Sequence, residues 1–453
     1  MGEKLKSTFD RYRPLLRTKT QDCSDHGFTM LQGYLFLDVD RNFENISQKI
    51  RGQDIDGQDL QQFMSDSNWQ AAEVFQKVRQ DIVGNLGLSG GVLNFDESGD
   101  ECSGKHKAGA ARQYLGREGK VDMGQVGVLS SYSKDGVWLL TDGELYLPAA
   151  WFSANGPLWD TEEGRGKAYK KLGIPADRAF KTKVELAMEQ FDRALADGLA
   201  FEAVGGDSFY GRSTGFRRHV GSKNCLYLFC VPTDTAVWLH DPMGEDGEGQ
   251  QYLMQKVSEV AEAATWETID VRPCERGVLR YEHAFVHVWT KDCGAAATFT
   301  KEVLVARREN DGSTSYALSN GLGEQHHTLA LWRAERYFVE RTIQDCKSEL
   351  GWDDLQARKY RAYMHTLALC AIALVFMADV KTQQRTQYET DDEVKKSIDI
   401  PRLPDLSLAN VKELMRAVFP LPQLSKEQAI QKVAQTLWKR AKSTESKHRK
   451  RGP

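Results

Sequence analysis

The spacing of apolar residues along the chain changes twice, from helical to strand-like and back to helical. Residues 1 to about 88 are mostly helical in pattern. Ser65-Asp66-Ser67 is a helix cap, and the apolar positions after it recur at helical spacing: Trp69, Val74, Phe75, Val78 and Ile82. Glycines then interrupt this pattern before residue 92. The first region is therefore predicted to be helical.

Strand patterns dominate the middle of the chain. They cover residues 92–95, 125–132 and 137–141, and an amphipathic helix over 183–198 leads into a further strand that ends at Asp207. Three strands, a helix and a fourth strand predict an α/β core with mixed strand pairing. Residues 225–320 carry more short strand patterns separated by turn residues, which predict a β-rich segment.

The pattern returns to helical after Gly321. The longest apolar run, residues 366–377, is about twelve residues long. That length is too short to cross a bilayer and predicts a buried helix, so we expect no membrane partner. The last segment contains two short helix candidates and a basic tail. These changes divide the chain into residues 1–88, 89–224, 225–320, 321–380 and 381–453.

Composition narrows the class of protein. A chain of 453 residues with 41% hydrophobic residues and ten Trp is long and apolar enough to fold into several domains. Its eight Cys include no C-x-x-C pair, which predicts reduced thiols in a cytoplasmic protein. The net charge of −4 counts against a general polyanion binder. Basic residues gather at both ends, however, with six Lys or Arg in residues 1–20 and seven in 438–451.

Three acidic residues lie in separate contexts that together favour a metal site. Asp96 ends the strand pattern of residues 91–96, Asp207 ends that of residues 201–207, and Glu340 lies on a predicted helix. Two divalent cations that catalyse phosphoryl transfer need oxygen ligands that converge from different elements of one core. The placement of these acids at two strand ends and on a helix suits that need.

Basic residues share the helix face of the third acid. At about 100° per residue, Arg336, Glu340 and Lys347 fall within an arc of roughly 40°. A metal-bound carboxylate flanked by cations that hold phosphates would have this pattern. A solvated, charge-paired helix face would have it too, and spacing alone leaves both interpretations open.

Other motifs do not indicate a site. His283 and His287 lie in an alternating apolar segment without further ligands nearby, so we interpret them as packed or surface residues. Gly104-Lys105 lacks the flanking residues of a phosphate loop, which excludes an ATPase of that type. The chain has no G-x-S-x-G elbow and no G-x-G-x-x-G after a strand, which argues against hydrolase and dinucleotide-binding folds.

A series of short motifs follows a fixed order along the chain. They are Asp96-Glu97-Ser98-Gly99, Gly104-Lys105-His106, Ala111-Arg112-Gln113-Tyr114, Gly119-Lys120, Gln125-Val126-Gly127-Val128, residues 145–151, Lys181-Thr182-Lys183 and residues 207–211. This set resembles the bacterial insertion-sequence transposases of the DDE class whose catalytic domain carries a β-rich insertion. The resemblance extends from roughly residue 30 to residue 380. It implies an RNase H-like mixed sheet core with a β-rich insertion, and helical N-terminal and C-terminal regions.

The third-acid helix of that family carries a Tyr-x2-Arg-x3-Glu-x6-Lys signature. Arg336, Glu340 and Lys347 match it, while Arg333 stands where the family has Tyr, and the adjacent Trp332 is a candidate for the missing aromatic ring. Asp100-Glu101 is a second departure, because the family usually has apolar and basic residues there. These two acids predict weaker DNA binding nearby.

The resemblance implies cut-and-paste DNA transposition, with Asp96, Asp207 and Glu340 as catalytic residues and ligands of two Mg²⁺ ions, for which Mn²⁺ can substitute. It implies DNA contacts that involve the helical residues 1–88 and five cations: Arg336, Lys347, Arg333, Arg112 and Lys120. The expected partners are double-stranded element ends and target DNA, bound by a homodimer in a synaptic complex of the nucleoid.

Two alternative functions stay open from the sequence. One is an RNase H-like, structure-selective nuclease that cleaves without strand transfer. The other is a DNA-binding descendant of a transposase that has lost catalysis. The intact acids Asp96, Asp207 and Glu340 argue against it, and the departures at Arg333 and Asp100-Glu101 keep it open.

Overall fold

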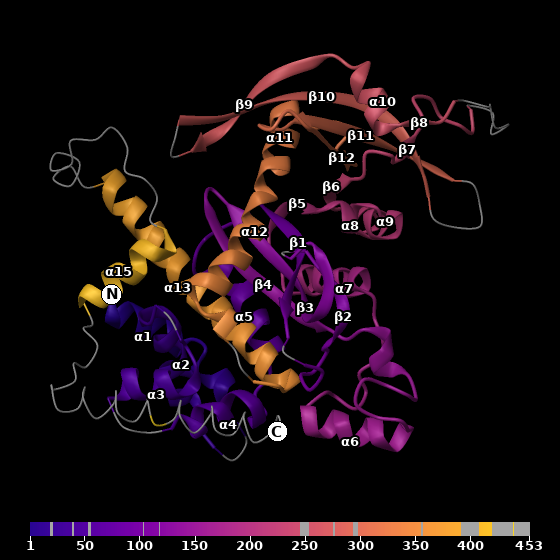
Figure 1. Cartoon of the computed structure of the whole chain (residues 1–453). Coiled ribbons are helices and arrows are strands. Elements are labelled where there is room, and N and C mark those ends of the chain that lie inside the picture. Colours follow the sequence, from indigo (N-terminus) through magenta and orange to yellow (C-terminus); the bar gives the residue numbers. More distant parts are fainter. Residues whose placement is uncertain are drawn as a thin grey trace.

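A mixed ten-stranded sheet runs through the computed structural model and is covered by helices (Figure 1). The structure describes residues 1–18, 21–38, 40–52, 56–102, 104–116, 118–244, 253–274, 277–292, 298–354, 357–390, 407–418 and 438. The α/β fold class predicted from the pattern is confirmed, and the arrangement is that of an RNase H-like core.

The N-terminal region is helical, as predicted. Its helices lie together at one side of the sheet, and their order along the chain is α1 (Gly2–Asp10), η1 (Arg13–Leu16), α2 (Ser24–Phe36), α3 (Phe43–Arg51), α4 (Gln58–Asp66) and α5 (Ala71–Gly84). The predicted cap was wrong, because Ser65 and Asp66 end α4 and α5 begins after Gln70, which makes no side-chain cap hydrogen bond. The apolar positions predicted from Val74 to Ile82 are buried on α5, whereas Trp69 precedes the helix. Helix α5 packs on strand β4, which joins this region to the core.

The core strands follow from α5. They are β1 (Gly91–Glu101), β2 (Ala111–Leu115), β3 (Lys120–Lys134), β4 (Val137–Tyr146), β5 (Phe201–Gly206) and β6 (Leu226–Val231). Strand β1 pairs antiparallel with β3 and parallel with β5, and β5 pairs parallel with β6. Between them the chain forms η2 (Ala149–Phe152), α6 (Glu162–Leu172), α7 (Lys183–Ala196), α8 (Ser208–Gly211) and α9 (Thr214–Ser222). Helix α7 begins with a capping box between Thr182 and Glu185.

The predicted β-rich insertion is confirmed. It contains β7 (Ala236–Val237), β8 (Gln255–Lys256), α10 (Val257–Glu262), β9 (Trp266–Cys274), β10 (Gly277–Lys291), β11 (Phe299–Arg308) and β12 (Thr314–Ser319). Strand β12 pairs with β6, so the insertion continues the core sheet in the order β6-β12-β11-β10-β9. The insertion therefore extends one edge of the core sheet.

Helices return after the insertion, as predicted. They are α11 (His326–Glu335), α12 (Tyr337–Gln344), a π-helical turn η3 (Asp345–Glu349), η4 (Trp352–Asp354), α13 (Tyr360–Thr390) and α15 (Leu408–Val418). In Figure 1, α11 and α12 descend from the insertion across the core sheet. The two C-terminal helix candidates and the basic tail lie largely outside the described residues, apart from α15 and Trp438.

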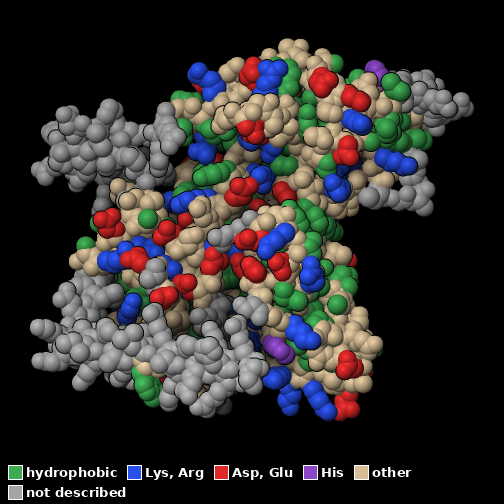
Figure 2. Space-filling model, in the orientation of Figure 1, with side chains coloured by type: hydrophobic (Ala, Val, Ile, Leu, Met, Phe, Trp, Pro, Cys, Tyr) green, Lys and Arg blue, Asp and Glu red, His purple; other side chains and the backbone are tan. Residues whose placement is uncertain are grey.

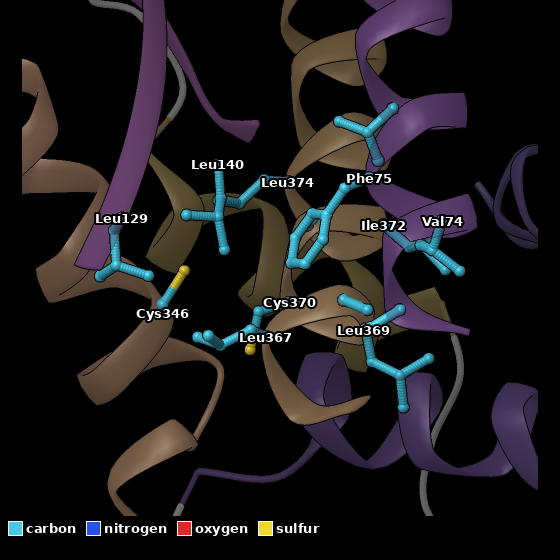
Figure 3. Packing of buried hydrophobic residues seen from close by; sticks show 14 of the residues in the cluster. Val74, Phe75, Leu129, Leu140, Cys346, Leu367, Leu369, Cys370, Ile372 and Leu374 are labelled. Carbon is cyan, nitrogen blue, oxygen red and sulfur yellow. The ribbon is translucent and has the colours of Figure 1, made fainter. Parts of the chain in front are cut away.

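Helix α13 forms the centre of the apolar core. Figure 3 shows its residues Leu369 and Ile372 near Val74 and Phe75 of α5, with Leu140 of β4 on the other side. Over Tyr360–Gln384 the helix is long and apolar enough to cross a membrane by length and composition, but 89% of its most apolar stretch is buried inside the protein. The predicted buried helix is thus confirmed and is longer than the run that predicted it.

Two further local predictions were wrong. Asp96 does not end its strand, because β1 continues to Glu101 through pairing with the long strand β3. The third-acid segment is not one regular helix, because α11 ends before Arg336 and a π-helical turn begins after Gln344. That turn carries Lys347, so the even spacing of 100° per residue does not hold there.

Candidate active site

Adjacent parallel strands bring Asp96 and Asp207 together. Phe95 of β1 lies opposite Gly206 of β5, so the residue after each is an acid at the same end of the strand pair. The Oδ1 atom of Asp207 accepts hydrogen bonds from the backbone amides of Phe209 (3.0 Å) and Tyr210 (3.3 Å) at the start of α8. This cap fixes the direction of the Asp207 side chain.

Helix α12 places Glu340 above the same strands. The helix contacts β1, β3 and β4, and it buries Phe338, Val339 and Thr342 against them. Glu340 lies on the other face, and its side chain is 51% exposed. Its Oε1 atom accepts a hydrogen bond of 2.6 Å from Nη2 of Arg336, one turn earlier.

The three acids line one cavity of about 1020 Å³. Strand β1 and the end of β5 form one wall, α12 and the π-helical turn form another, and residues of β6 and β12 close the side towards the insertion. Arg333, Arg336 and Lys347 also line it. The sequence prediction that the three carboxylates and these cations share one site is consistent with this cavity.

The electrostatics of Asp96 reflect its neighbours. Burial and the nearby carboxylate of Asp207 raise the pKa of Asp96 to about 7, and Glu340 acts in the same direction. The backbone amide of Glu97 and the guanidinium of Arg336 lower it in part. Asp96 therefore lies close enough to both other acids for their charges to affect it.

The three carboxylates are the kind of ligand that a divalent cation binds, but in this structure they are not close enough together to share one. Among the described residues, no three His, Cys, Asp or Glu side chains are close enough to hold one metal ion. Glu340 is turned towards Arg336 instead. The ligand set nevertheless consists only of carboxylates, as a hard cation requires, and a cation would offset the repulsion that raises the pKa of Asp96.

Lys347 has acidic partners within the protein. Its side chain is 6% exposed, and its Nζ atom contacts the Asp100 carboxylate, lies 3.8 Å from Asp353, and lies 5.1 Å from the ring centre of Trp352. The sequence marked Asp100 as a departure from the family but could not pair it with a residue 247 positions away. In the structure, Asp100 forms an ion pair with Lys347.

Arg333 is buried rather than free in the cavity. It is 5% exposed, its guanidinium donates to Oγ of Ser315 and Sγ of Cys230, both at 2.7 Å, and burial lowers its pKa. Trp332, the candidate for the missing aromatic ring, is 3% exposed and its Nε1 lies 3.5 Å from Glu202. Neither side chain replaces an exposed Tyr in this structure.

The other two predicted cations lie on a hairpin formed by β2 and β3. Arg112 is exposed on β2, and Lys120 at the start of β3 forms an ion pair of 2.9 Å with Asp122. Neither lines the cavity, but Tyr114 and Gly116 of the same hairpin do. Tyr114 belongs to one of the family-like motifs, but its place at the cavity could not be predicted, because a strand pattern does not show what a side chain faces.

The surface shows no single basic patch on the face drawn in Figure 2. Lys and Arg side chains are interspersed with Asp and Glu over both the core and the insertion. This mixture agrees with the net charge of −4.

Comparison with known proteins agrees with this arrangement. A family model described as "DDE superfamily endonuclease" matches residues 12–284, which is more than half of the chain and includes Asp96 and Asp207. The chain belongs to this family. It is also 25% identical over 321 residues to the "Probable transposase for insertion sequence element IS701" of Microchaete diplosiphon, covering 69% of this chain and 71% of that protein. The match to the family ends before Glu340, which lines the same cavity as Asp96 and Asp207, so the role of Glu340 as the third acid stays a prediction.

Proposed function

We propose that this DDE endonuclease is a transposase that cuts DNA at the ends of a mobile element and joins the freed ends to target DNA. The observation that carries the proposal is that Asp96, Asp207 and Glu340, from two neighbouring strands and a crossing helix, line one open cavity. A family model for endonucleases and a similar protein named as a probable transposase support it.

Asp96, Asp207 and Glu340 would hold two Mg²⁺ ions, with Mn²⁺ as a substitute. The chemistry that these ions supply when bound is activation of the attacking water or 3′-hydroxyl and neutralisation of charge on the leaving oxygen. Asp96 would be one of the metal ligands, since the charges of Asp207 and Glu340 both raise its pKa. Glu340 would have to exchange its contact with Arg336 for the metal.

The chain's cations would hold the strand in place. Burial lowers the pKa of Arg336, but Cys230 and the charges of all three acids raise it overall, and Glu340 is in direct contact with the guanidinium of Arg336. Its guanidinium, freed from Glu340, would face a phosphate next to the cut. Lys347 on the cavity wall, with Arg112 and Lys120 on the hairpin, would contact phosphates without reading base sequence. Cutting and joining two ends at once requires two active sites, so we propose that a homodimer acts on double-stranded ends and target.

A second candidate is a DNA-binding descendant that no longer cleaves. The ion pair between Glu340 and Arg336, together with the contact between Lys347 and Asp100, favours it, because both signature residues are engaged within the chain. Cleavage separates the two candidates.

The test uses the purified protein and a linear DNA that carries the inverted repeats flanking its gene. With Mg²⁺ we expect cuts at the repeat ends and 3′ ends joined to a target plasmid, and with EDTA we expect neither. Cuts without joined products would indicate the structure-selective nuclease, and binding without cuts would indicate the non-catalytic descendant.

Single charge removals locate the chemistry. We expect Asp96→Asn, Asp207→Asn and Glu340→Gln each to reduce cleavage by at least about 10³-fold, since metal coordination needs the carboxylate charge. Gel-shift affinity for the same DNA should change by less than about threefold, because phosphate contacts rest on the basic residues. Three variants that all cleave at the wild-type rate would place the active site elsewhere.

A further inference from the structure

The hairpin of β2 and β3 presents a distinct outer face beside the cavity. Residues of β2 alternate, so Arg112 and Tyr114 point outwards while Leu115 is buried. Tyr114 lies directly opposite Val121 of β3, and these two side chains are 58% and 53% exposed. We call Arg112, Tyr114 and Val121 the hairpin face.

Tyr114 is the exposed aromatic side chain of the catalytic cavity. Among the described residues that line the cavity, the aromatic ones are Tyr114 and Tyr316, and Tyr316 is only 8% exposed. The signature position that carries Tyr in the family is the buried Arg333. The hairpin thus places the ring of Tyr114 at the cavity, whereas the helix has Arg333 at the position where the family has Tyr.

An exposed ring at this place suits one kind of contact. In a duplex, the faces of the bases are covered by their neighbours, whereas an unpaired base offers a face on which a phenol ring can stack. Arg112 lies two residues from Tyr114 on the same side of the strand, where a guanidinium can hold the phosphate of the stacked nucleotide. The Tyr114 ring therefore lines the cavity that holds the three acids, and Arg112 lies next to this ring on the hairpin, outside the cavity lining.

We propose that Tyr114 stacks on an unpaired base of the DNA strand held at Asp96 and Asp207, with Arg112 on the adjacent phosphate. This inference rests on the proposed function and adds that the bound strand is locally single-stranded at the hairpin face. Tyr114 acts as a positioning residue, because it orients the strand and does not touch the reacting atoms.

The experiment measures binding of the full-length protein to two probes in EDTA, so that neither is cut. One probe is a fluorescent single-stranded oligothymidylate with one 2-aminopurine, and the other is a blunt duplex of mixed sequence. We expect Tyr114→Ala to weaken binding of the single strand by about 5- to 150-fold, since stacking contributes about 1–3 kcal/mol per base. Binding of the duplex should change by less than about twofold.

Two further variants make the result specific. Tyr114→Phe keeps the ring and should retain both the affinity and the quenching of 2-aminopurine that stacking produces. Tyr337→Ala removes a tyrosine of similar exposure, 55%, from α12 outside the cavity lining, and should leave both unchanged.

The inference is overturned if Tyr114→Ala binds the single strand as Tyr337→Ala does, or if it loses duplex binding equally. It is also overturned if Tyr114→Ala abolishes self-association while DNA affinity is unchanged, because the hairpin face would then bind a second copy of the chain. A wild-type protein that binds neither probe and cuts no DNA would overturn the proposed function as well. If the wild-type protein cleaves DNA and Tyr114→Ala binds the single strand as tightly as the wild type does, only the inference about Tyr114 is overturned.

Discussion

Asp100 and Glu101 are neighbouring acids at the end of β1, but only Asp100 contacts Lys347. A DNA phosphate that approaches Lys347 must compete with this carboxylate. We expect Asp100→Asn to strengthen DNA binding by about 3- to 10-fold and to steepen the salt dependence by about one unit of slope, as for one added phosphate contact. Fluorescence anisotropy across a salt series measures both quantities.

The matched control is Glu101→Gln, which removes the same charge one residue away and should change affinity by less than about twofold with no change in slope. In a Lys347→Ala background, Asp100→Asn should have no further effect. If Asp100→Asn and Glu101→Gln act alike, Asp100 affects DNA through general charge and not through Lys347.

Single residues show what the sequence could and could not predict about the site. Asp96, Asp207 and Glu340 were recognisable because each follows or lies on an element whose apolar pattern is clear. The contact of Lys347 with Asp100 could not be recognised in the sequence, because it joins residues 247 positions apart. The burial of Arg333 could not be predicted from the sequence either, because a helical pattern does not show which strand packs over the helix.

At the scale of elements, a buried charge cluster fastens the insertion to α9. Glu302 of β11 is fully buried and accepts hydrogen bonds from Arg217 (3.0 Å) and Tyr227 (2.6 Å), with Arg218 at 3.4 Å. Although burial raises the pKa of Glu302, these arginines lower it overall. The cluster therefore depends on a charged Glu302.

We expect Glu302→Gln to lower the free energy of unfolding by about 3 kcal/mol, because it leaves two largely buried arginines without their shared carboxylate. Denaturant titration followed by circular dichroism measures the change. Glu282→Gln in the same sheet removes an exposed pair with Arg308 and should cost less than about 1 kcal/mol. Equal effects of the two substitutions would contradict the role of the buried cluster.

The elements themselves were largely predictable. Each strand predicted in residues 225–320 is present, because alternating apolar residues pack on one face of the extended sheet. The short strand β2 was missed, since Arg112 and Tyr114 face outwards and only Leu115 is buried. The pairing of β6 with both β5 and β12 was also not predictable, because strand patterns do not specify partners.

At the scale of the whole molecule, His365 joins the central helix to the N-terminal helices. Its ring stacks on Trp69 at 3.5 Å, and its two nitrogens lie 2.9 Å from the carbonyl oxygens of Met64 and Trp69. Burial lowers the pKa of His365 to about 3, although the two carbonyl oxygens, which can both accept only from a protonated ring, raise it in part. In the unfolded chain, the His365 ring binds a proton once the pH falls below about 6.5. In the folded protein, it binds a proton only when the pH falls to about 3.

Stability should therefore fall as the pH drops from about 6.5 towards about 3. We expect His365 to account for a loss of about 2 kcal/mol between neutral pH and about pH 5. Unfolding curves of the wild-type protein and of His365→Gln at several pH values measure this share. The variant should be less stable at neutral pH but less sensitive to acid, and parallel pH profiles would contradict the assignment.

Helix α13 has a consequence for how the protein is made. Helices α1, α2, α4 and α5 and strand β4 all contact α13, which leaves the ribosome after the whole insertion. Until then these elements lack the helix that all of them contact, although α5 and β4 can already pack on each other. We expect a chain released before α13 to carry Asp96 and Asp207 without the central helix of their core, and to be cut by proteases faster than the full chain. Premature termination would then yield a chain that holds both residues in an incomplete fold.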